Sequence, residues 1–130
     1  MKVLLPFHLN KVGAGFPSPA TDYVEDDIDL NVHLIKNIPS TFLIRVQGKS
    51  MNKVGIHDGD LLIVDKSLNP KKFSTVIVNI NEELVVKTFI KENNQSFLTS
   101  GSKKIEDKIN LTKNPEILIW GIVTYVIHAL

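Results

Sequence analysis

A series of short apolar runs, each closed by turn-forming residues, constrains the fold of this chain more than any other feature. These runs lie within segments with a β pattern, residues 42–46, 61–64, 75–80, 84–90, 95–99 and a longer final stretch, 117–127. Asp58-Gly59, Asn69-Pro70 and Asn93-Asn94 lie between them and favour tight turns. The pattern predicts a mostly β protein with a compact antiparallel sheet or barrel-like fold.

The first 22 residues have a different character, because they show no sustained period of either 2 or 3.6 residues. Residues that disfavour regular structure are spread through them: Pro6, Gly13, Gly15, Pro17 and Pro19. Proline removes a backbone donor and biases the preceding residue towards extended conformations. We therefore expect an extended N-terminal arm over residues 1–22, followed by a β domain over residues 23–130.

The junction between arm and β domain carries an acidic segment and one short helix. Glu25-Asp26-Asp27 is most simply a solvated linker. Asp29 is placed to cap a helix that extends to about Lys36, because aspartate accepts hydrogen bonds from free N–H groups at helix starts. Pro39 is expected to end this element.

Composition narrows the possible functions. The chain has 130 residues and a formal net charge of +1, without the dense basic stripe that binding through nucleic-acid phosphates needs. Direct, sequence-specific DNA binding is therefore not expected. Cysteine is absent, which excludes disulfides and is compatible with a reducing compartment. No run approaches the ~20 apolar residues of a membrane span, so we expect a cytoplasmic protein that does not enter a membrane.

Metal and cofactor chemistry are also not expected from the sequence. The four histidines, His8, His33, His57 and His128, lack the paired spacing of a zinc site. Each is interpreted as a surface histidine or one with its hydrogen bonds satisfied. The sequence therefore predicts no metal site and no cofactor.

One lysine stands in an apolar run and one serine follows another. Lys87 lies beside Val86, and desolvation there disfavours the ammonium form. A neutral lysine is a base, and it can activate a serine hydroxyl without a histidine. Ser50 follows Gly48, which permits a tight turn that exposes the next side chains. Ser50 and Lys87 are therefore a candidate nucleophile and general base.

The same residues allow a simpler interpretation. Lys87 alternates with Val85 and Phe89, so it also fits an outward-pointing lysine on an edge strand. If catalysis is correct, Val85, Val86 and Phe89 are expected to supply apolar walls around Lys87. The backbone amides of Lys49 and Ser50 are then candidates for stabilising the charge on a tetrahedral intermediate.

Three motifs occur in order along the chain: Gly48-Lys49-Ser50-Met51, GIHDGDLLIVD over residues 55–65, and Val85-Val86-Lys87. They resemble the LexA/UmuD family of self-cleaving Ser-Lys peptidases, and the similarity covers nearly the whole chain. Upstream, Val12-Gly13-Ala14-Gly15 resembles the family's Ala-Gly scissile bond. The resemblance implies Ser50 as nucleophile, Lys87 as general base and the Ala14–Gly15 peptide bond as substrate.

The resemblance is to UmuD-like members in particular, because only fourteen residues precede the scissile bond, too few for a helix-turn-helix domain. It implies a homodimer whose self-cleavage is stimulated by a RecA filament on single-stranded DNA after damage. The shortened product is then expected to act as an accessory subunit of a UmuC-like, error-prone translesion DNA polymerase. These are roles in SOS mutagenesis.

Two departures from the family pattern are visible. Lys49 precedes the candidate nucleophile where a small or acidic residue is frequent, and the arm before Ala14 is short. Alternative interpretations are a signal-peptidase-like protease, for which the expected membrane anchor is missing, and a non-proteolytic, β-rich interaction module. A third is a phage or plasmid LexA-like regulator without a DNA-binding domain.

Overall fold

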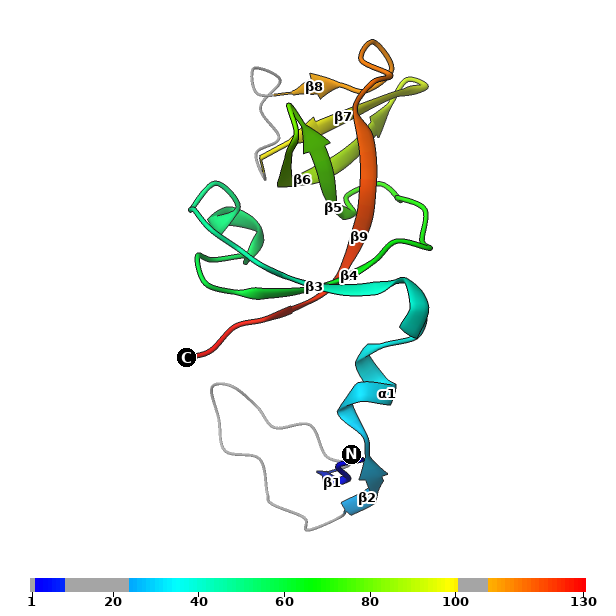
Figure 1. Cartoon of the computed structure of the whole chain (residues 1–130), viewed down its shortest axis with the longest axis vertical. Coiled ribbons are helices and arrows are strands. Elements are labelled where there is room, and N and C mark those ends of the chain that lie inside the picture. Colours follow the sequence, from blue (N-terminus) through cyan, green and yellow to red (C-terminus); the bar gives the residue numbers. More distant parts are fainter. Residues whose placement is uncertain (1, 9–23, 101–107) are drawn as a thin grey trace. The chain divides into compact units, whose positions relative to one another are not determined.

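The computed structural model describes residues 2–8, 24–100 and 108–130, which fall into two compact units, residues 1–36 and 37–130 (Figure 1). The expected boundary between residues 22 and 23 lies outside the described residues. No helix among the described residues is long and apolar enough to cross a membrane.

The first unit contains a two-stranded antiparallel sheet and a helix. Strand β1 (Leu5–His8) pairs with β2 (Val24–Ile28). The interpretation of Glu25-Asp26-Asp27 as a linker is wrong, because these residues belong to β2. The pairing with β1, distant in sequence, supplies the backbone hydrogen-bond partners that make this polar segment a strand.

Helix α1 (Leu30–Leu34) confirms the predicted helix in a shorter form. The side chain of Asp29 caps it by accepting a hydrogen bond from the backbone N–H of Asn31 at 3.0 Å. The helix ends at Leu34 instead of extending to Lys36, so Pro39 does not end it.

The second unit is a seven-stranded antiparallel sheet with the order β3-β4-β9-β5-β6-β7-β8. The strands are β3 (Thr41–Arg45), β4 (Leu61–Asp65), β5 (Thr75–Ile80), β6 (Glu83–Glu92), β7 (Gln95–Thr99), β8 (Ile109–Asn110) and β9 (Leu118–Ile127). Two short 3-10 helices, η1 (Ile38–Ser40) and η2 (Asn52–Val54), precede β3 and β4 respectively. The mostly β fold with antiparallel strands is confirmed; the two-residue strand β8 was not predicted.

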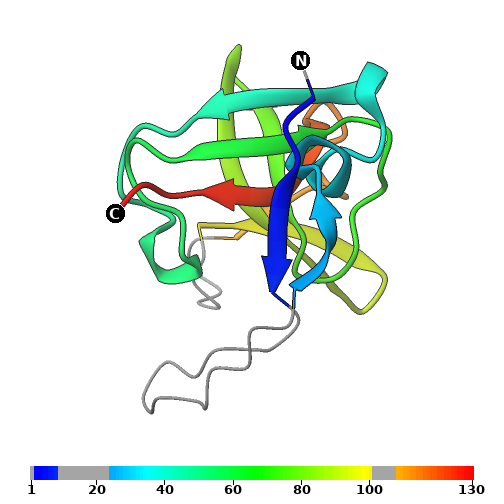
Figure 2. The same ribbon diagram turned by 90° about the horizontal axis from the view of Figure 1, so that it is seen from below.

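Strand β9 joins the two halves of this sheet. Its first half pairs with β5 and its second half with β4, so β3, β4 and the end of β9 lie side by side (Figures 1 and 2). At Gly121, where the two pairings meet, a Cβ atom would lie 2.5 Å from the side chain of Val64. Glycine is therefore required here because the neighbouring side chain takes the space.

Two apolar clusters form the core of this unit. The first contains Val46, Met51, Ile56, Leu62, Val64 and Ile77. The second contains Val76, Val78, Phe89, Leu98 and Ile122. Successive strand residues point to opposite faces, so β5 contributes Ile77 to one cluster and its two neighbours to the other. Burial on both faces explains the three consecutive apolar residues from Val76 to Val78.

Candidate functional site

The loop between β3 and β4 presents Ser50 at its surface. Met51 and Ile56 are only 3% and 2% exposed and fasten the loop to the first core cluster, while Ser50 itself is exposed. Gly48 adopts a φ of 103°, in the left-handed region that favours glycine, and its N–H donates to Asp58 Oδ1 at 2.8 Å. The sequence thus folds locally into a turn with an apolar anchor directly after the serine.

Lys87 lies on β6 and pairs with Val76 of β5. The pairing of β6 with β7 begins only at Thr88, so at Lys87 the strand has a neighbour on one side only, although β6 as a whole lies between β5 and β7. The side chain is half-buried, and its Nζ donates a hydrogen bond to Ser100 Oγ at 2.7 Å. Ser100 follows the end of β7 and had not been predicted as part of the site.

Ser50 and Lys87 line the same cavity, which has a volume of about 410 Å³. One wall comes from the end of β3 and the loop that follows it; the other comes from the start of β6, with Val85 and Val86 beside Lys87. Phe89, expected as a further apolar wall, packs instead in the second core cluster. Among the described residues, no direct hydrogen bond joins Ser50 to Lys87.

The backbone N–H groups of Lys49 and Ser50 are the groups expected to stabilise the negative charge on a tetrahedral intermediate. The carbonyl of Lys49 accepts a hydrogen bond from the N–H of Asn52 at 3.1 Å, which closes a turn. Within the described part of the chain, the N–H groups of Lys49 and Ser50 donate to no other group. Ala14 and Gly15, the expected scissile pair, lie outside the described residues.

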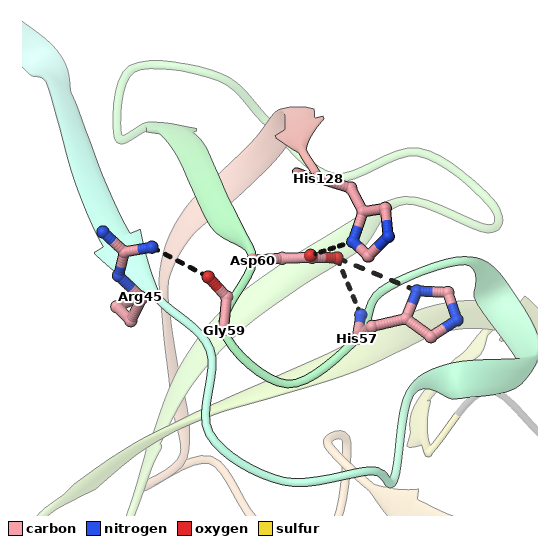
Figure 3. A network of polar contacts seen from close by, with 5 residues as sticks. All are labelled: Arg45, His57, Gly59, Asp60 and His128. Atoms are coloured by element: carbon pink, nitrogen blue, oxygen red, sulfur yellow. Dashed lines mark hydrogen bonds and ion pairs between the residues drawn. The ribbon is translucent and has the colours of Figure 1, made fainter. Parts of the chain in front are cut away.

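A second polar group surrounds Asp60, which is only 2% exposed (Figure 3). Its Oδ2 accepts a hydrogen bond from the backbone N–H of His57 at 2.8 Å, and its Oδ1 lies 2.6 Å from His128 Nδ1. The hydrogen bond from the His57 backbone, followed by that from His128, lowers the pKa of Asp60 below its ordinary value. Nearby, Arg45 Nη1 donates to the carbonyl of Gly59 at 2.8 Å.

This second group was missed by sequence reasoning. His57 and His128 are 71 residues apart in the sequence, so their spacing indicated no shared site. Antiparallel pairing of β4 with β9 brings them together, since Asp60 immediately precedes β4 and His128 immediately follows β9. The sequence contains no local signal for this group, because the group depends on the pairing of β4 with β9.

Comparison with known proteins identifies the relatives of this chain. A family model described as Peptidase S24-like matches residues 6–124. Protein ImpA of Salmonella typhimurium is 40% identical over 123 residues, which are 95% of this chain and 83% of ImpA. Protein MucA of Escherichia coli is 34% identical over 93% of this chain and 82% of MucA. The LexA repressor of Clostridium novyi is 33% identical over 75% of this chain and 48% of the repressor. The resemblance to the LexA/UmuD family is confirmed.

Proposed function

The chain belongs to the Peptidase S24-like family, and from this premise we propose that it is a self-cleaving serine peptidase with a Ser50-Lys87 catalytic pair. The scissile bond is the one between Ala14 and Gly15. The observation that carries the proposal is the cavity shared by Ser50 and Lys87, with a hydroxyl on one wall and an amine on the other.

In the proposed reaction, neutral Lys87 takes the proton from Ser50 Oγ as this oxygen attacks the carbonyl carbon of Ala14. The N–H groups of Lys49 and Ser50 stabilise the negative charge on the Ala14 carbonyl oxygen. Lys87 then returns the proton to the amine of Gly15 as the C–N bond breaks. Water then hydrolyses the ester between Ala14 and Ser50. This step releases residues 1–14 and regenerates the Ser50 hydroxyl in the product, which contains residues 15–130.

The hydrogen bond between Lys87 and Ser100 is compatible with the role of a base. Lys87 Nζ is the donor in this 2.7 Å bond, so the lone pair of a neutral amine remains free to accept the proton of Ser50. When enzyme and substrate are one chain, effective concentrations are high, so the population of the docked arm controls the rate. A RecA filament on single-stranded DNA would then act by stabilising the docked arm.

We place this peptidase activity in SOS mutagenesis. The support is the similarity of the chain to ImpA, MucA and the LexA repressor, together with the motifs of UmuD-like members. The cleaved protein acts as a homodimer and as an accessory subunit of a UmuC-like translesion polymerase. Association with the polymerase before and after cleavage tests this assignment.

The intact mass of the purified protein, incubated at neutral and alkaline pH, tests the peptidase proposal. A parallel series contains RecA, single-stranded DNA and a nucleotide. We expect the parent to lose residues 1–14, and Ser50→Ala and Lys87→Ala to remain intact. Lys91→Ala, an exposed lysine of the same strand, is the matched control and should cleave like the parent.

Three results would contradict the proposal. Cleavage in Ser50→Ala would exclude Ser50 as the nucleophile, and cleavage at the parent's rate in Lys87→Ala would exclude Lys87 as the base. A parent chain that stays intact under every condition would favour a non-proteolytic, β-rich interaction module.

A further inference from the structure

The side chains around Asp60 form a group of nitrogen and oxygen donors that the proposed peptidase reaction does not use. His57 Nδ1 lies 3.9 Å from Asp60 Oδ2, and His128 Nδ1 lies 2.6 Å from Asp60 Oδ1 (Figure 3). One donor atom from each of the three side chains lies within 4.8 Å of the other two. The three donor atoms are therefore close enough together to be candidate ligands of one ion.

The central carboxylate is held in place before any ligand arrives. The N–H of Asp60 donates to the carbonyl of His57 at 3.0 Å, and the carbonyl of Asp60 accepts from the N–H of Val46 at 2.8 Å. The backbone N–H of His57 fixes Oδ2 at 2.8 Å. Hydrogen bonds of this kind orient metal-ligating carboxylates and limit the entropy lost on binding.

Access to the group comes from the two imidazoles. Each has a side chain that is 48% exposed, whereas Asp60 is buried. The rings lie 5.3 Å apart between centroids at an angle of 47°, so they are not stacked face to face. The two half-exposed imidazoles therefore bring the group into contact with solvent.

We propose that His57, Asp60 and His128 form a binding site for a divalent transition-metal ion. Two imidazole nitrogens and one carboxylate oxygen are typical ligands of Zn²⁺, which often takes three protein ligands and one water. Mg²⁺ and Ca²⁺ prefer oxygen ligands and fit this donor set less well. The ion replaces the proton shared by His128 and Asp60, and the half-exposed imidazoles rotate to bring each donor to about 2.0–2.2 Å from the metal.

This site is separate from the cavity of Ser50 and Lys87, because none of its three ligands lines that cavity. Bound metal would nevertheless connect the β3–β4 loop, which carries Ser50, to the segment that follows β9. The consequence is a cross-link between two parts of the sheet that are distant in sequence. Metal binding can be measured without any reference to peptide cleavage.

The experiment is a calorimetric titration of the metal-free, untagged full chain with ZnCl₂ in a buffer that does not coordinate metals. We expect one Zn²⁺ per chain, and at least a tenfold weaker affinity in His57→Ala and in His128→Ala. His33→Ala, in helix α1, is the matched control and should bind like the parent. Ser50→Ala should also bind like the parent, which separates this result from the peptidase proposal.

A second measurement on the unmodified chain covers the case in which a variant fails to fold. Zn²⁺ should shift the imidazole NMR signals of His57 and His128 and leave those of His33 unchanged. Zn²⁺ should also raise the melting temperature of the parent by mass action. Absence of saturable binding, parent-like affinity in both variants, or a shift at His33 in place of His57 and His128 would overturn the proposal and leave only a hydrogen-bonded group.

Discussion

Two buried aspartates lie at opposite ends of strand β4 and differ in the kind of partner that each has. Asp60 immediately precedes the strand and Asp65 is its last residue. They are 2% and 4% exposed, and hydrogen bonds lower the pKa of both. Burial and pKa direction therefore do not distinguish them.

The hydrogen-bond partners of Asp65 are all neutral groups, from the segment just before β3 and the turn just after β4. Its Oδ2 accepts from Asn37 Nδ2 at 2.8 Å, and its Oδ1 accepts from Ser40 Oγ at 2.9 Å. Ser67 donates to Oδ1 twice, through its N–H at 2.8 Å and its hydroxyl at 2.6 Å. Donation by the side chain of Asn37, then by that of Ser67, holds the pKa of Asp65 far below its ordinary range.

Asp60 instead faces two imidazoles, which are half-exposed and can exchange a proton for a metal ion. Asp65 is instead held by amide and hydroxyl donors, and none of these donors is an imidazole. The difference teaches that a buried carboxylate with a lowered pKa marks a binding site only when its partners are themselves accessible ligands. We therefore assign a structural role to Asp65 and a ligand role to Asp60.

The largest expected effect is on stability, from replacing Asp65 by alanine. Asp65→Ala leaves three side chains and one backbone N–H without their acceptor, and we expect it to lower the free energy of unfolding by about 3 kcal/mol. Asp60→Ala should cost less, because its imidazole partners can turn to solvent. Urea unfolding followed by circular dichroism measures both. An equal or greater loss in Asp60→Ala would break the comparison.

A second expected effect concerns acid stability. The folded-state pKa of Asp65 lies below its unfolded value, so its contribution is fully present above about pH 5 and is lost as the pH falls below about 4. Asp65→Asn should therefore be less stable than the parent at neutral pH and show a shallower loss of stability on acidification. Urea unfolding at a series of pH values measures this slope; parallel slopes in both proteins would contradict the assignment.

The smallest expected effect separates the two roles most sharply. Ser67→Ala removes one donor of the Asp65 group, the Ser67 hydroxyl, and keeps the backbone N–H. It should lower the free energy of unfolding by about 1 kcal/mol without changing Zn²⁺ affinity. His128→Ala should weaken Zn²⁺ binding with little loss of stability in metal-free buffer. Calorimetry and urea unfolding on both variants test this, and a change in Zn²⁺ affinity in Ser67→Ala would show that the groups are coupled.

Most of the fold could be predicted from local patterns. Apolar runs bounded by turn residues located the long strands, and the Asp29 cap located the helix. Strands β2 and β8 were missed because β2 is acidic and β8 is short, so neither carries an apolar pattern. Their strand character comes from pairing with β1 and β7, which are contacts between separate segments.

The candidate residues divide in the same way. Motifs indicated Ser50 and Lys87, whose chemical types and neighbours are local properties of the sequence. Ser100 and His128 carried no such signal, because each acquires its partner only when strands pair.

The sequence by itself determined the β class, the capped helix and the family, since periodicity, turn residues and ordered motifs are properties of neighbouring positions. Only the tertiary structure decided that Lys87 is bonded to Ser100, and that His57 and His128 meet at Asp60. The physical reason is that strand order and register arise from pairing between distant segments, and these bring together side chains whose separation along the chain carries no information about their distance in space.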